Sequence, residues 1–310
     1  MVDKPVWITD NAIYLKEINE KIKLDYLYSI FYSIGLDNLA ERTGQPKITQ
    51  EPIYSLSIPL PPLKEQEKIA DILSTADAKI DAISSQIQKA ETLKKGLLQK
   101  LLSEGIGHNE FKDSELGKIP ESWEVSKLED ISAFITKGAT PTTYGFNWEE
   151  TGIPFLRSEC VSDNGLVMKA AMFISDEAHK HMNRSEIKNG DLLMTITGNV
   201  GRVVMLKDAI TIGNINQHIA RIRLTSNQVD SQFIYQYVSQ DRYRLNYYKI
   251  TTGQAYPQIS LKQVRNSIVP LPPLDEQKQI ANILLTAAEK LEVLRAKKEK
   301  YETLKKGLLQ

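Results

Sequence analysis

The chain has 310 residues, of which 41% are hydrophobic and 25% charged, and its 39 basic and 39 acidic side chains cancel to a formal net charge of zero. This composition excludes a wholly disordered chain and leaves room for two domains with cores of their own. The single cysteine, Cys160, excludes disulfides within the chain and cysteine-based metal clusters, and it suits a reducing cytoplasm. The sequence shows no signal-peptide pattern and no apolar run of membrane-spanning length, so we expect a cytoplasmic protein without a membrane partner.

The first 58 residues contain few predicted elements. Residues 6–8 and 12–15 are short strand-like runs, and residues 24–35 are apolar enough for one helix. These elements are too few to close a core. Parts of the stretch also return later, since Thr-Gly-Gln occurs at 43–45 and again at 252–254, each time ahead of a strand and a long helix. We therefore expect the C-terminal fragment of a first domain, without its front half.

The most informative feature is a long internal repeat. Residues 59–99 and 270–310 align without a gap at an offset of 211 residues and are identical at 24 of 41 positions. Identity is concentrated at the ends, in PLPPL and ETLKKGLLQ, while the middle keeps its apolar spacing. That spacing alternates steps of four and three from Ile69 to Ala90 and from Ile280 to Tyr301, with Lys298 as one polar exception. This is a heptad seam.

The seam predicts two long helices, at 64–104 and 275–310. Proline pairs set both starts, and a glutamate in each first turn faces the positive end of the helix dipole. About 40 helical residues would span roughly 60 Å, which is longer than most globular helices. Since such a helix cannot bury its stripe alone, we expect the two copies to pair antiparallel. An ordinary pair of core helices is the alternative.

The stretch between the helices predicts a compact domain. A polar linker at 108–118 leads into many short strand candidates separated by turns, clearest at 153–156, 192–196, 202–206 and 219–224, with one helix at 231–243. The predicted fold class is therefore α+β, a β-rich domain combined with two long helices that form an antiparallel coiled coil.

Catalytic motifs are absent from the sequence. It contains no GxxxxGK[ST] loop, no HExxH and no aromatic-flanked Asn-Pro-Pro or Asp-Pro-Pro tetrapeptide of the amino-methyltransferase kind. His179 and His181 lack a third ligand at metal-site spacing, and exposed positions explain them better. Residues 198–201 (GNVG) lie between two strand candidates, where a hairpin turn using Asn and Gly at positive φ is favoured over a phosphate loop. We predict neither enzymatic activity nor a cofactor.

Binding residues are easier to find. Residues 118–194 hold 8 basic and 12 acidic side chains, whereas residues 195–269 hold 9 basic and 3 acidic ones. Polar and basic side chains gather in four loop-like stretches of the types that read base edges and hold phosphates, although the same residue types also make ordinary turns. Tyr256 fits a phosphate contact or a core position equally well. The predicted DNA-contacting residues are Lys137, Thr140, Thr142, Arg157, Thr197, Asn199, Arg202, Thr252, Gly253, Gln254, Tyr256 and Gln258.

The lysines of the repeated KKGLLQ segment form a second candidate site. Lys94 and Lys95 in the first copy match Lys305 and Lys306 in the second, and a helix seam by itself needs only the apolar positions. We therefore predict that these four lysines contact a partner protein. Recent duplication, with the lysines on a solvated face, is the alternative.

Several of these stretches together resemble one protein family. GKIPESWEVSKLEDI at 117–131, GDLLMTITGNVGRV at 190–203, INQHIARI at 215–222, TTGQAYPQIS at 251–260 and both PLPPLxEQ helices are similar to the specificity subunits of type I restriction-modification enzymes. The resemblance covers essentially the whole chain. It implies a non-catalytic subunit whose recognition domain reads half of a bipartite site in double-stranded DNA, with spacer helices on which modification subunits dock and, through them, restriction subunits.

The resemblance also implies a domain plan. Residues 1–62 correspond to the C-terminal fragment of a first recognition domain, 63–112 to the first spacer helix and linker, 113–272 to a complete recognition domain, and 273–310 to the second spacer. The counterparts of GKIPESWEV and GDLLMTITG are missing ahead of the first spacer, which leaves a truncated gene, a split gene, or completion by a second copy or another chain. Two other functions stay open, a coiled-coil scaffold that binds protein without sequence-specific DNA binding and, more weakly, a free methyltransferase.

Overall fold

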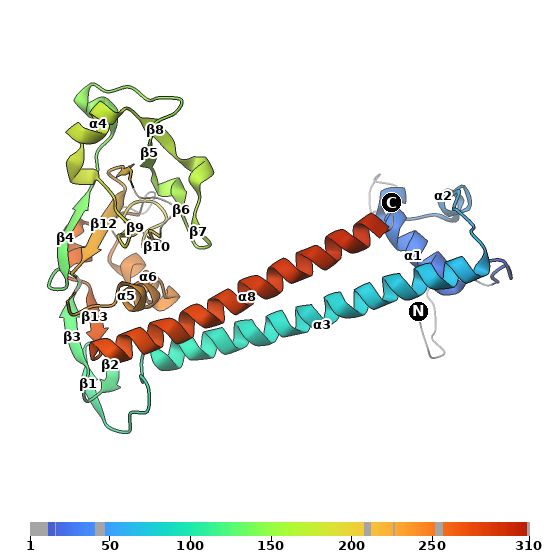
Figure 1. Ribbon diagram of the computed structural model, residues 1–310, viewed down its shortest axis with the longest axis horizontal. Helices are drawn as coiled ribbons and strands as arrows, with labels where there is room; N and C mark the ends of the chain where they lie inside the picture. Colours follow the sequence, from blue (N-terminus) through green and yellow to red (C-terminus); the bar gives the residue numbers. More distant parts are fainter. Residues whose placement is uncertain are drawn as a thin grey trace. The chain divides into compact units, whose positions relative to one another are not determined.

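The computed structural model describes residues 12–15, 17–40, 47–207, 212–225, 227–251 and 257–308, and the structural statements below concern these residues (Figure 1). The chain divides into two compact units. One comprises residues 1–91 with 289–310, and the other comprises residues 92–288. Each long helix contributes one segment to each unit.

The first unit begins with a short helical region. It contains α1 (Leu24–Ile34), η1 (Leu36–Leu39) and α2 (Gln50–Tyr54). The helix predicted at 24–35 is present as α1, which ends one residue earlier because Gly35, at φ 67°, adopts the left-handed conformation that glycine tolerates without strain. Residues 12–15 form no strand, so that prediction is wrong; they are exposed, and no described strand pairs with them.

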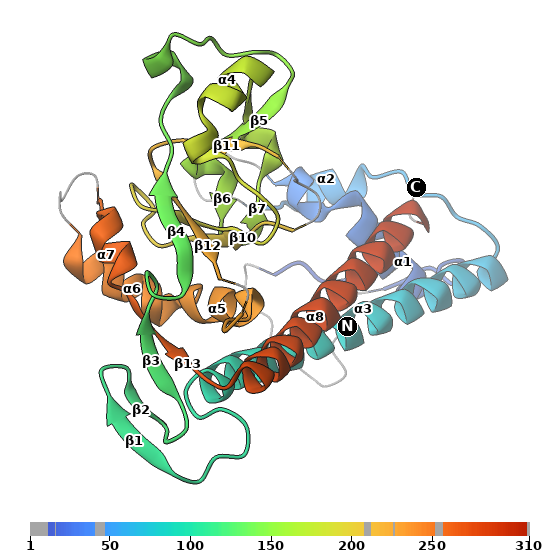
Figure 2. The same cartoon turned by 60° about the vertical axis from the view of Figure 1, so that its left-hand side comes forward.

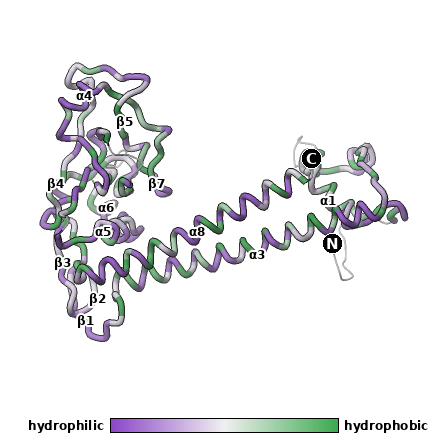
Figure 3. Tube along the Cα trace, in the orientation of Figure 1, coloured by the Kyte–Doolittle hydropathy of each residue, from purple (hydrophilic) through white to green (hydrophobic). Residues whose placement is uncertain are grey.

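The two spacer helices are α3 (Leu63–Leu101) and α8 (Leu274–Leu308). Within the first unit their direction is fixed by two ion pairs, Arg295–Glu91 at 2.9 Å and Lys305–Asp77 at 2.6 Å. From Arg295 to Lys305 the residue number rises along α8, while that of the partner on α3 falls from Glu91 to Asp77. The two helices therefore pair antiparallel, as predicted. Hydropathy alternates along both of them (Figure 3).

The predicted seam is the buried stripe of this pair. In the first unit it includes Leu73, Ala76, Ile83 and Leu291, each at most 7% exposed. In the second unit Ile280, Ala281 and Leu284 of α8 share one apolar core with residues 97–98 and 101–102 at the end of α3. Burying one stripe against the other supplies the tertiary packing that a long amphipathic helix needs.

The second unit is β-rich, and its central sheet has the strand order β10-β9-β12-β4. All three pairings are antiparallel, and β12 lies between β9 and β4. The bounds are β4 (Ser132–Lys137), β9 (Leu192–Thr195), β10 (Val203–Met205) and β12 (Ile219–Leu224). The strands predicted at 192–196, 202–206 and 219–224 are therefore present, two of them shorter by one or two residues.

Smaller sheets surround this one. A three-stranded sheet has the order β11-β5-β8, and two-stranded sheets pair β1 with β2, β3 with β13 and β6 with β7. The bounds are β1 (Phe111–Ser114), β2 (Gly117–Pro120), β3 (Glu124–Lys127), β5 (Ile153–Leu156), β6 (Val161–Ser162), β7 (Gly165–Leu166), β8 (Met172–Ile174), β11 (Asn214–Ile215) and β13 (Ile268–Leu271). The short helices are η2 (Pro141–Tyr144), η3 (Ser158–Cys160), η4 (Met168–Ala170), α4 (Asp176–His181), η5 (Asn183–Ser185) and α7 (Leu261–Arg265).

The single helix predicted at 231–243 is wrong. The structure has two helices there, α5 (Ser231–Val238) and α6 (Asp241–Ile250), labelled separately in Figure 2, and the extended backbone of Gln240 (φ −65°, ψ 143°) interrupts the helix between them. On one continuous helix, Tyr237 and Tyr243 would face directions about 120° apart. The break lets both rings pack edge to face at 5.6 Å. Burial of aromatic surface therefore overrides the local helical pattern.

The main core lies between the central sheet, α5, α6 and the start of α8. Trp123, 0% exposed, is its largest fully buried side chain, and its Nε1–H donates to Glu276 Oε2 at 3.0 Å. Glu276 Oε1 also accepts from the backbone N–H of Ile106 and lies 2.8 Å from His108 Nε2. This carboxylate ties the linker and β3 region to the first turn of the second spacer. No described helix is long and apolar enough to cross a membrane.

Candidate nucleic-acid interface

Several predicted DNA-contacting residues meet at one end of the central sheet. Lys137 ends β4 and pairs with Ala220 near the start of β12, and Ile196 N–H donates to the carbonyl of His218 at 2.9 Å. Thr140 Oγ1 donates to Gln217 Oε1 at 3.0 Å. The end of β4, the end of β9 and the turn before β12 therefore form one polar edge.

Gly138 fixes the turn that follows β4. Its N–H donates to the carbonyl of Asn216 at 3.1 Å, and a Cβ at this position would lie 1.6 Å from the carbonyl oxygen of Ile215. Only glycine allows the two backbones to approach so closely. The glycine therefore positions Lys137 and Thr140, on either side of it, over the turn at 216–218.

Arg157 reaches the same edge from β5. The carbonyl of Leu156 accepts from Asn216 N–H at 3.0 Å, so the residue that follows β5 lies beside this turn. The Arg157 side chain is 39% exposed, and its nearest carboxylate oxygen, from Glu159, is 4.0 Å away. Its Nε is buried and has no hydrogen-bond partner among the described residues. The guanidinium is thus only weakly paired within the described residues.

Gln258 joins the edge through the loop that connects β9 to β10. It forms an isolated antiparallel bridge with Thr197, and the flanking bonds run from Gly198 N–H to the carbonyl of Pro257 and from Ile259 N–H to the carbonyl of Ile196. Gln258 is exposed, whereas Thr197 is only 5% exposed. Thr197 therefore supports the loop with its backbone. Thr252, Gly253, Gln254 and Tyr256 lie outside the described residues.

We define the sheet-end surface as the six side chains that this geometry brings together. Two of them, Gln217 and His218, are additions to the predicted set. The signal that could have found them is their place in INQHIARI, directly before the strand whose start organises the edge. Both are half-buried, and Gln217 Nε2 lies 3.2 Å from His218 Nε2. The sheet-end surface comprises Lys137, Thr140, Arg157, Gln217, His218 and Gln258.

Three other predicted residues have different surroundings. Thr142 is exposed on η2. Asn199 is exposed in the hairpin turn, and its carbonyl accepts a hydrogen bond from Thr195 Oγ1. The turn itself is present, but positive φ comes from Gly198 and Gly201 alone, since no described residue other than glycine has positive φ. Arg202 pairs with Asp163 at 3.1 Å. That carboxylate also binds Arg244 at 2.7 Å.

The predicted docking lysines occupy matching places in the repeat. Lys94 lines a pocket of about 390 Å³ that also contains Arg202, Tyr235 and Leu285. Lys305 lines a pocket of about 630 Å³ in the first unit, with counterparts of those α5 and α8 residues on α1 and α3. Lys305 Nζ also lies 3.9 Å from the centre of the Tyr32 ring, and its side chain is only 12% exposed. Lys95 and Lys306 are exposed.

The histidines singled out in the sequence have structural contacts. His179 Nδ1 lies 2.6 Å from Asn214 Oδ1, and the His181 ring packs against Tyr144 and Phe146 at 5.1 and 5.4 Å. Across the described ranges, no three His, Cys, Asp or Glu side chains gather in a way that could hold a metal ion.

Comparison with known proteins gives a consistent answer. The profile of the type I restriction modification DNA specificity domain matches residues 1–92 and 120–303. The chain is 32% identical over 306 residues to a putative type I restriction enzyme MjaX specificity subunit of Methanocaldococcus jannaschii, covering 96% of this chain and 69% of that protein. It is 26% identical over 264 residues to the EcoBI specificity subunit of Escherichia coli, covering 80% and 53%.

Solved structures agree at the level of the fold. The type I restriction-modification S subunit from M. genitalium aligns with a TM-score of 0.61 at 16% identity, over 93% of this chain and 72% of that one. The HsdS subunit from Thermoanaerobacter tengcongensis aligns with a TM-score of 0.55 at 20% identity, over 92% and 68%. With two spacer helices, a β-rich domain and a profile match over most of its length, the chain belongs to the family of DNA specificity subunits of type I restriction-modification enzymes.

Proposed function

We propose that residues 113–272 read one half of a bipartite DNA target through the sheet-end surface. The observation that carries this proposal is the convergence of side chains from four separate stretches on the turn before β12. Four of these six side chains are cationic or amide-bearing. Lys137 and Arg157 are suited to phosphates, and Gln217 and Gln258 offer the paired donor and acceptor that a base edge presents in the major groove.

The subunit recognises DNA and does not catalyse. It delivers the modification subunits, and through them the restriction subunits, to the site that it reads. The setting that we propose is the cytoplasm, where these partners and the DNA meet. The antiparallel spacers α3 and α8 would then act as the rigid frame of the assembly.

We further propose that residues 1–62 act as the end of another recognition domain. The support is the repeat: α1 precedes α3 as α5 precedes α8, and Tyr26 is buried at 2% exposure as Phe233 is at 0%. Each spacer therefore begins from the same kind of domain end.

The test is binding to cognate and random duplex DNA across a salt series. We expect Arg157→Ala to weaken binding to both duplexes and to reduce the slope of log affinity against log salt by about one, because it removes one phosphate contact. Gln217→Ala and Gln258→Ala should instead reduce the preference for the cognate duplex, by about 1–3 kcal/mol each. Asn109→Ala, which removes an exposed amide in the linker outside the predicted DNA-contacting set, is the matched control.

The opposite pattern would move the interface. If Gln217→Ala and Gln258→Ala kept full preference while Thr142→Ala or Arg202→Ala lost it, the DNA would be read by η2 or by the Asp163 side of the domain. If the parent protein bound no DNA at any salt concentration, the scaffold function would take its place.

A further inference from the structure

The internal repeat gives each unit a pocket beside the spacer helices, and the two pockets are built in the same way. In the second unit the pocket is about 390 Å³ and is lined by one face of α5, by α8 and by Lys94 of α3. In the first unit it is about 630 Å³ and is lined by one face of α1, by α3 and by Lys305 of α8. Lys94 and Lys305 occupy aligned positions of the repeat. The surroundings of these two lysines can therefore be compared position by position.

The lysine of the first unit is neutralised within the chain. Lys305 Nζ lies 2.6 Å from Asp77 Oδ1 and 3.9 Å from the centre of the Tyr32 ring, and the lysine side chain is only 12% exposed. An ammonium group that already has a carboxylate and an aromatic face at these distances needs no further partner.

The matching lysine of the second unit has neither of these partners. The repeat offset of 211 residues puts Ala288 where the first unit has Asp77. Both α1 and α5 begin directly after a residue whose N–H donates to the aligned glutamine of the spacer, and counting from that residue puts Ser239 where the first unit has Tyr32. A methyl group and a hydroxyl thus replace the carboxylate and the ring. Lys94 is half-buried, where an ammonium without a partner costs more than it does on the open surface.

The charge of this pocket is positive as a whole. Its lining carries four basic and two acidic side chains, namely Lys94, Arg202, Lys207, Arg244, Asp163 and Asp241. Asp163 is shared between two of the cations, at 3.1 Å from Arg202 and 2.7 Å from Arg244. Lys94 and Lys207 form no ion pair among the described residues. The excess of positive charge favours an anionic occupant.

The rest of the lining favours an acidic side chain over a DNA phosphate. It includes Leu98 of α3, Val203 of β10 and Leu285 of α8, so the pocket is partly apolar. A glutamate carries its carboxylate on an apolar stem, which matches a lining that is partly cationic and partly apolar. The phosphates of a duplex lie on the outside of a convex rod and bring no apolar group with them.

We propose that the pocket of the second unit binds an acidic side chain of the modification subunit, and that Lys94 pairs with its carboxylate. The choice of this partner rests on the proposed function, in which the spacers hold the modification subunit beside the domain that reads the DNA. Both spacers and the recognition domain line the pocket, so a segment bound there contacts the frame and the recognition domain together. The pocket of the first unit does not make the same contact, because its lysine is already paired.

The experiment measures the affinity of the purified modification subunit for the full-length specificity subunit and four variants. Lys94→Ala removes the unpaired ammonium, and Ala288→Asp supplies the carboxylate that Lys305 has in the first unit. Ala288→Asn, which has the same size without the charge, is the matched control for Ala288→Asp. Lys100→Ala, at an exposed lysine of α3 that does not line the pocket, is the control for Lys94→Ala. Thermal melting of each free protein and its binding to cognate DNA are measured in parallel.

We expect Lys94→Ala and Ala288→Asp each to weaken binding of the modification subunit by about fivefold to tenfold, whereas the two controls stay within about twofold of the parent. DNA binding should be unchanged, and each variant should melt no lower than its control. Parental affinity of either variant for the modification subunit would overturn the proposal.

Two other results would also overturn it. Equal losses with Ala288→Asn and Ala288→Asp would show that packing, and not charge, is the cause. A loss of DNA binding with an intact contact to the modification subunit would assign the pocket to a phosphate. Failure of the parent to bind DNA at any salt concentration would instead count against the proposed function, while the affinity for the modification subunit would still test the pocket.

Discussion

Gln66 and Gln277 make the same three hydrogen bonds in the two halves of the internal repeat. Both are 0% exposed and occupy aligned positions in the first turn of α3 and of α8. In each, Nε2 donates to two backbone carbonyls and Oε1 accepts one backbone N–H. The partners are Pro61, Lys21 and Lys23 for Gln66, and Pro272, Gln228 and Asp230 for Gln277, at 2.8–3.2 Å. One amide thus clamps the segment that enters α1 or α5 onto the start of the spacer.

The clamp predicts a large loss of stability when it is removed. We expect Gln277→Ala to lower the free energy of unfolding by about 2–3 kcal/mol, because it leaves buried backbone groups without partners. Gln277→Glu should be at least as damaging, since it keeps the acceptor but turns an oxygen toward two carbonyls. Urea unfolding monitored by circular dichroism gives both values. A glutamate variant as stable as the parent would show that the donors are dispensable.

The buried carboxylate of Asp191 binds one of two neighbouring arginines on β12. It is 1% exposed and binds Arg223 through two bonds of 2.6 and 2.7 Å. The guanidinium carbons of Arg221 and Arg223 lie 4.4 and 4.8 Å from the centre of the Phe134 ring. Burial lowers the pKa of Arg221 to about 10, whereas the hydrogen bonds to Asp191 raise the pKa of Arg223, so the charge that is costly to bury is that of Arg221.

Removing that carboxylate should therefore destabilise strongly. We expect Asp191→Asn to lower the free energy of unfolding by about 3–5 kcal/mol, because it leaves buried positive charge uncompensated. Asp163→Asn is the control, since that carboxylate binds Arg202 and Arg244 but is 53% exposed, and the change should cost at most about 1 kcal/mol. Chemical denaturation of the two variants side by side tests the difference; equal losses would contradict it.

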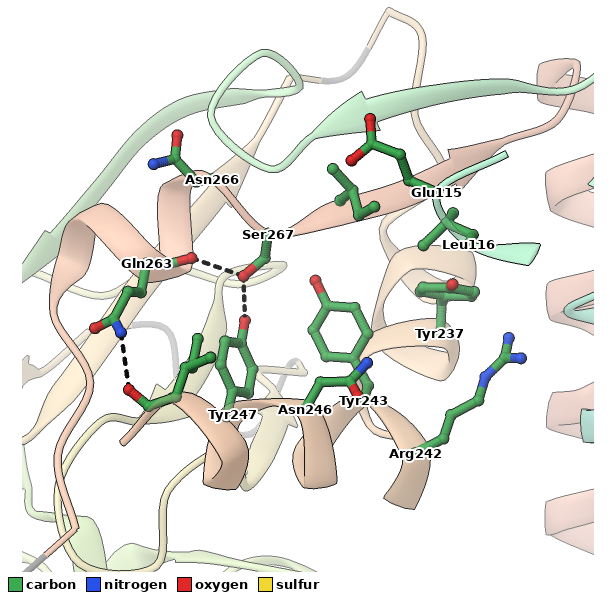
Figure 4. A pocket seen from close by; sticks show the side chains of 12 residues that line it. Glu115, Leu116, Tyr237, Arg242, Tyr243, Asn246, Tyr247, Gln263, Asn266 and Ser267 are labelled. Carbon is green, nitrogen blue, oxygen red and sulfur yellow. Dashed lines mark hydrogen bonds between the residues drawn. The ribbon is translucent and has the colours of Figure 1, made fainter. Parts of the chain in front are cut away.

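The two buried tyrosines of α6, Tyr243 and Tyr247 (Figure 4), predict a loss of folding stability at alkaline pH. Burial raises the pKa of Tyr247 to about 12, and it raises the pKa of Tyr243 well above its ordinary value. Unfolded tyrosine ionises near pH 10, so between about pH 10 and 12 the unfolded state binds fewer protons than the folded state. Stability is therefore unaffected below pH 10 and falls as the pH rises from 10 to 12.

For Tyr247 alone, this loss amounts to about 2–3 kcal/mol at pH 12. Tyr247→Phe should flatten the fall, whereas Tyr248→Phe, the exposed neighbour on α6, should leave it unchanged. Denaturant unfolding at each pH, with phenolate absorbance as a second signal, measures the effect. A parent whose stability is constant from pH 10 to 12 would rule out the buried phenol as its source.

Substitutions at the repeated lysines should have different effects, because the surroundings of these lysines differ. Lys305 is paired with Asp77 and covers the Tyr32 ring, so Lys305→Ala is expected to cost about 0.5–1 kcal/mol of stability, recovered as coupling in a double-mutant cycle with Asp77→Ala. The exposed Lys95 and Lys306 should instead affect assembly. Their combined change to glutamate is expected to reduce capture of the modification subunit without changing helicity; unchanged capture would leave them as solvated side chains.

Much of the architecture follows from the sequence alone. Heptad spacing and two proline pairs predict both spacers to within a few residues, because a long apolar stripe has no alternative to burial against an equal stripe. Ile153–Leu156 and Ile219–Leu224 are strands with the predicted bounds, because short apolar runs bounded by turn residues have little other choice. The sequence also predicts that Lys137 and Gln258 belong to one surface, which stays a prediction for DNA contact.

Only the tertiary structure determines which polar side chains are exposed and which are buried or paired within the protein. Arg202 and Thr197 have the same kinds of sequence neighbours as the other candidates, yet one is paired with Asp163 and the other is 5% exposed. The break between α5 and α6 likewise depends on tertiary packing, because Tyr237 and Tyr243 both belong to the main core that the central sheet and α8 also form. Local sequence determines which conformations a segment prefers, whereas burial and pairing depend on contacts between residues distant in the chain, and these exist only once the chain has folded.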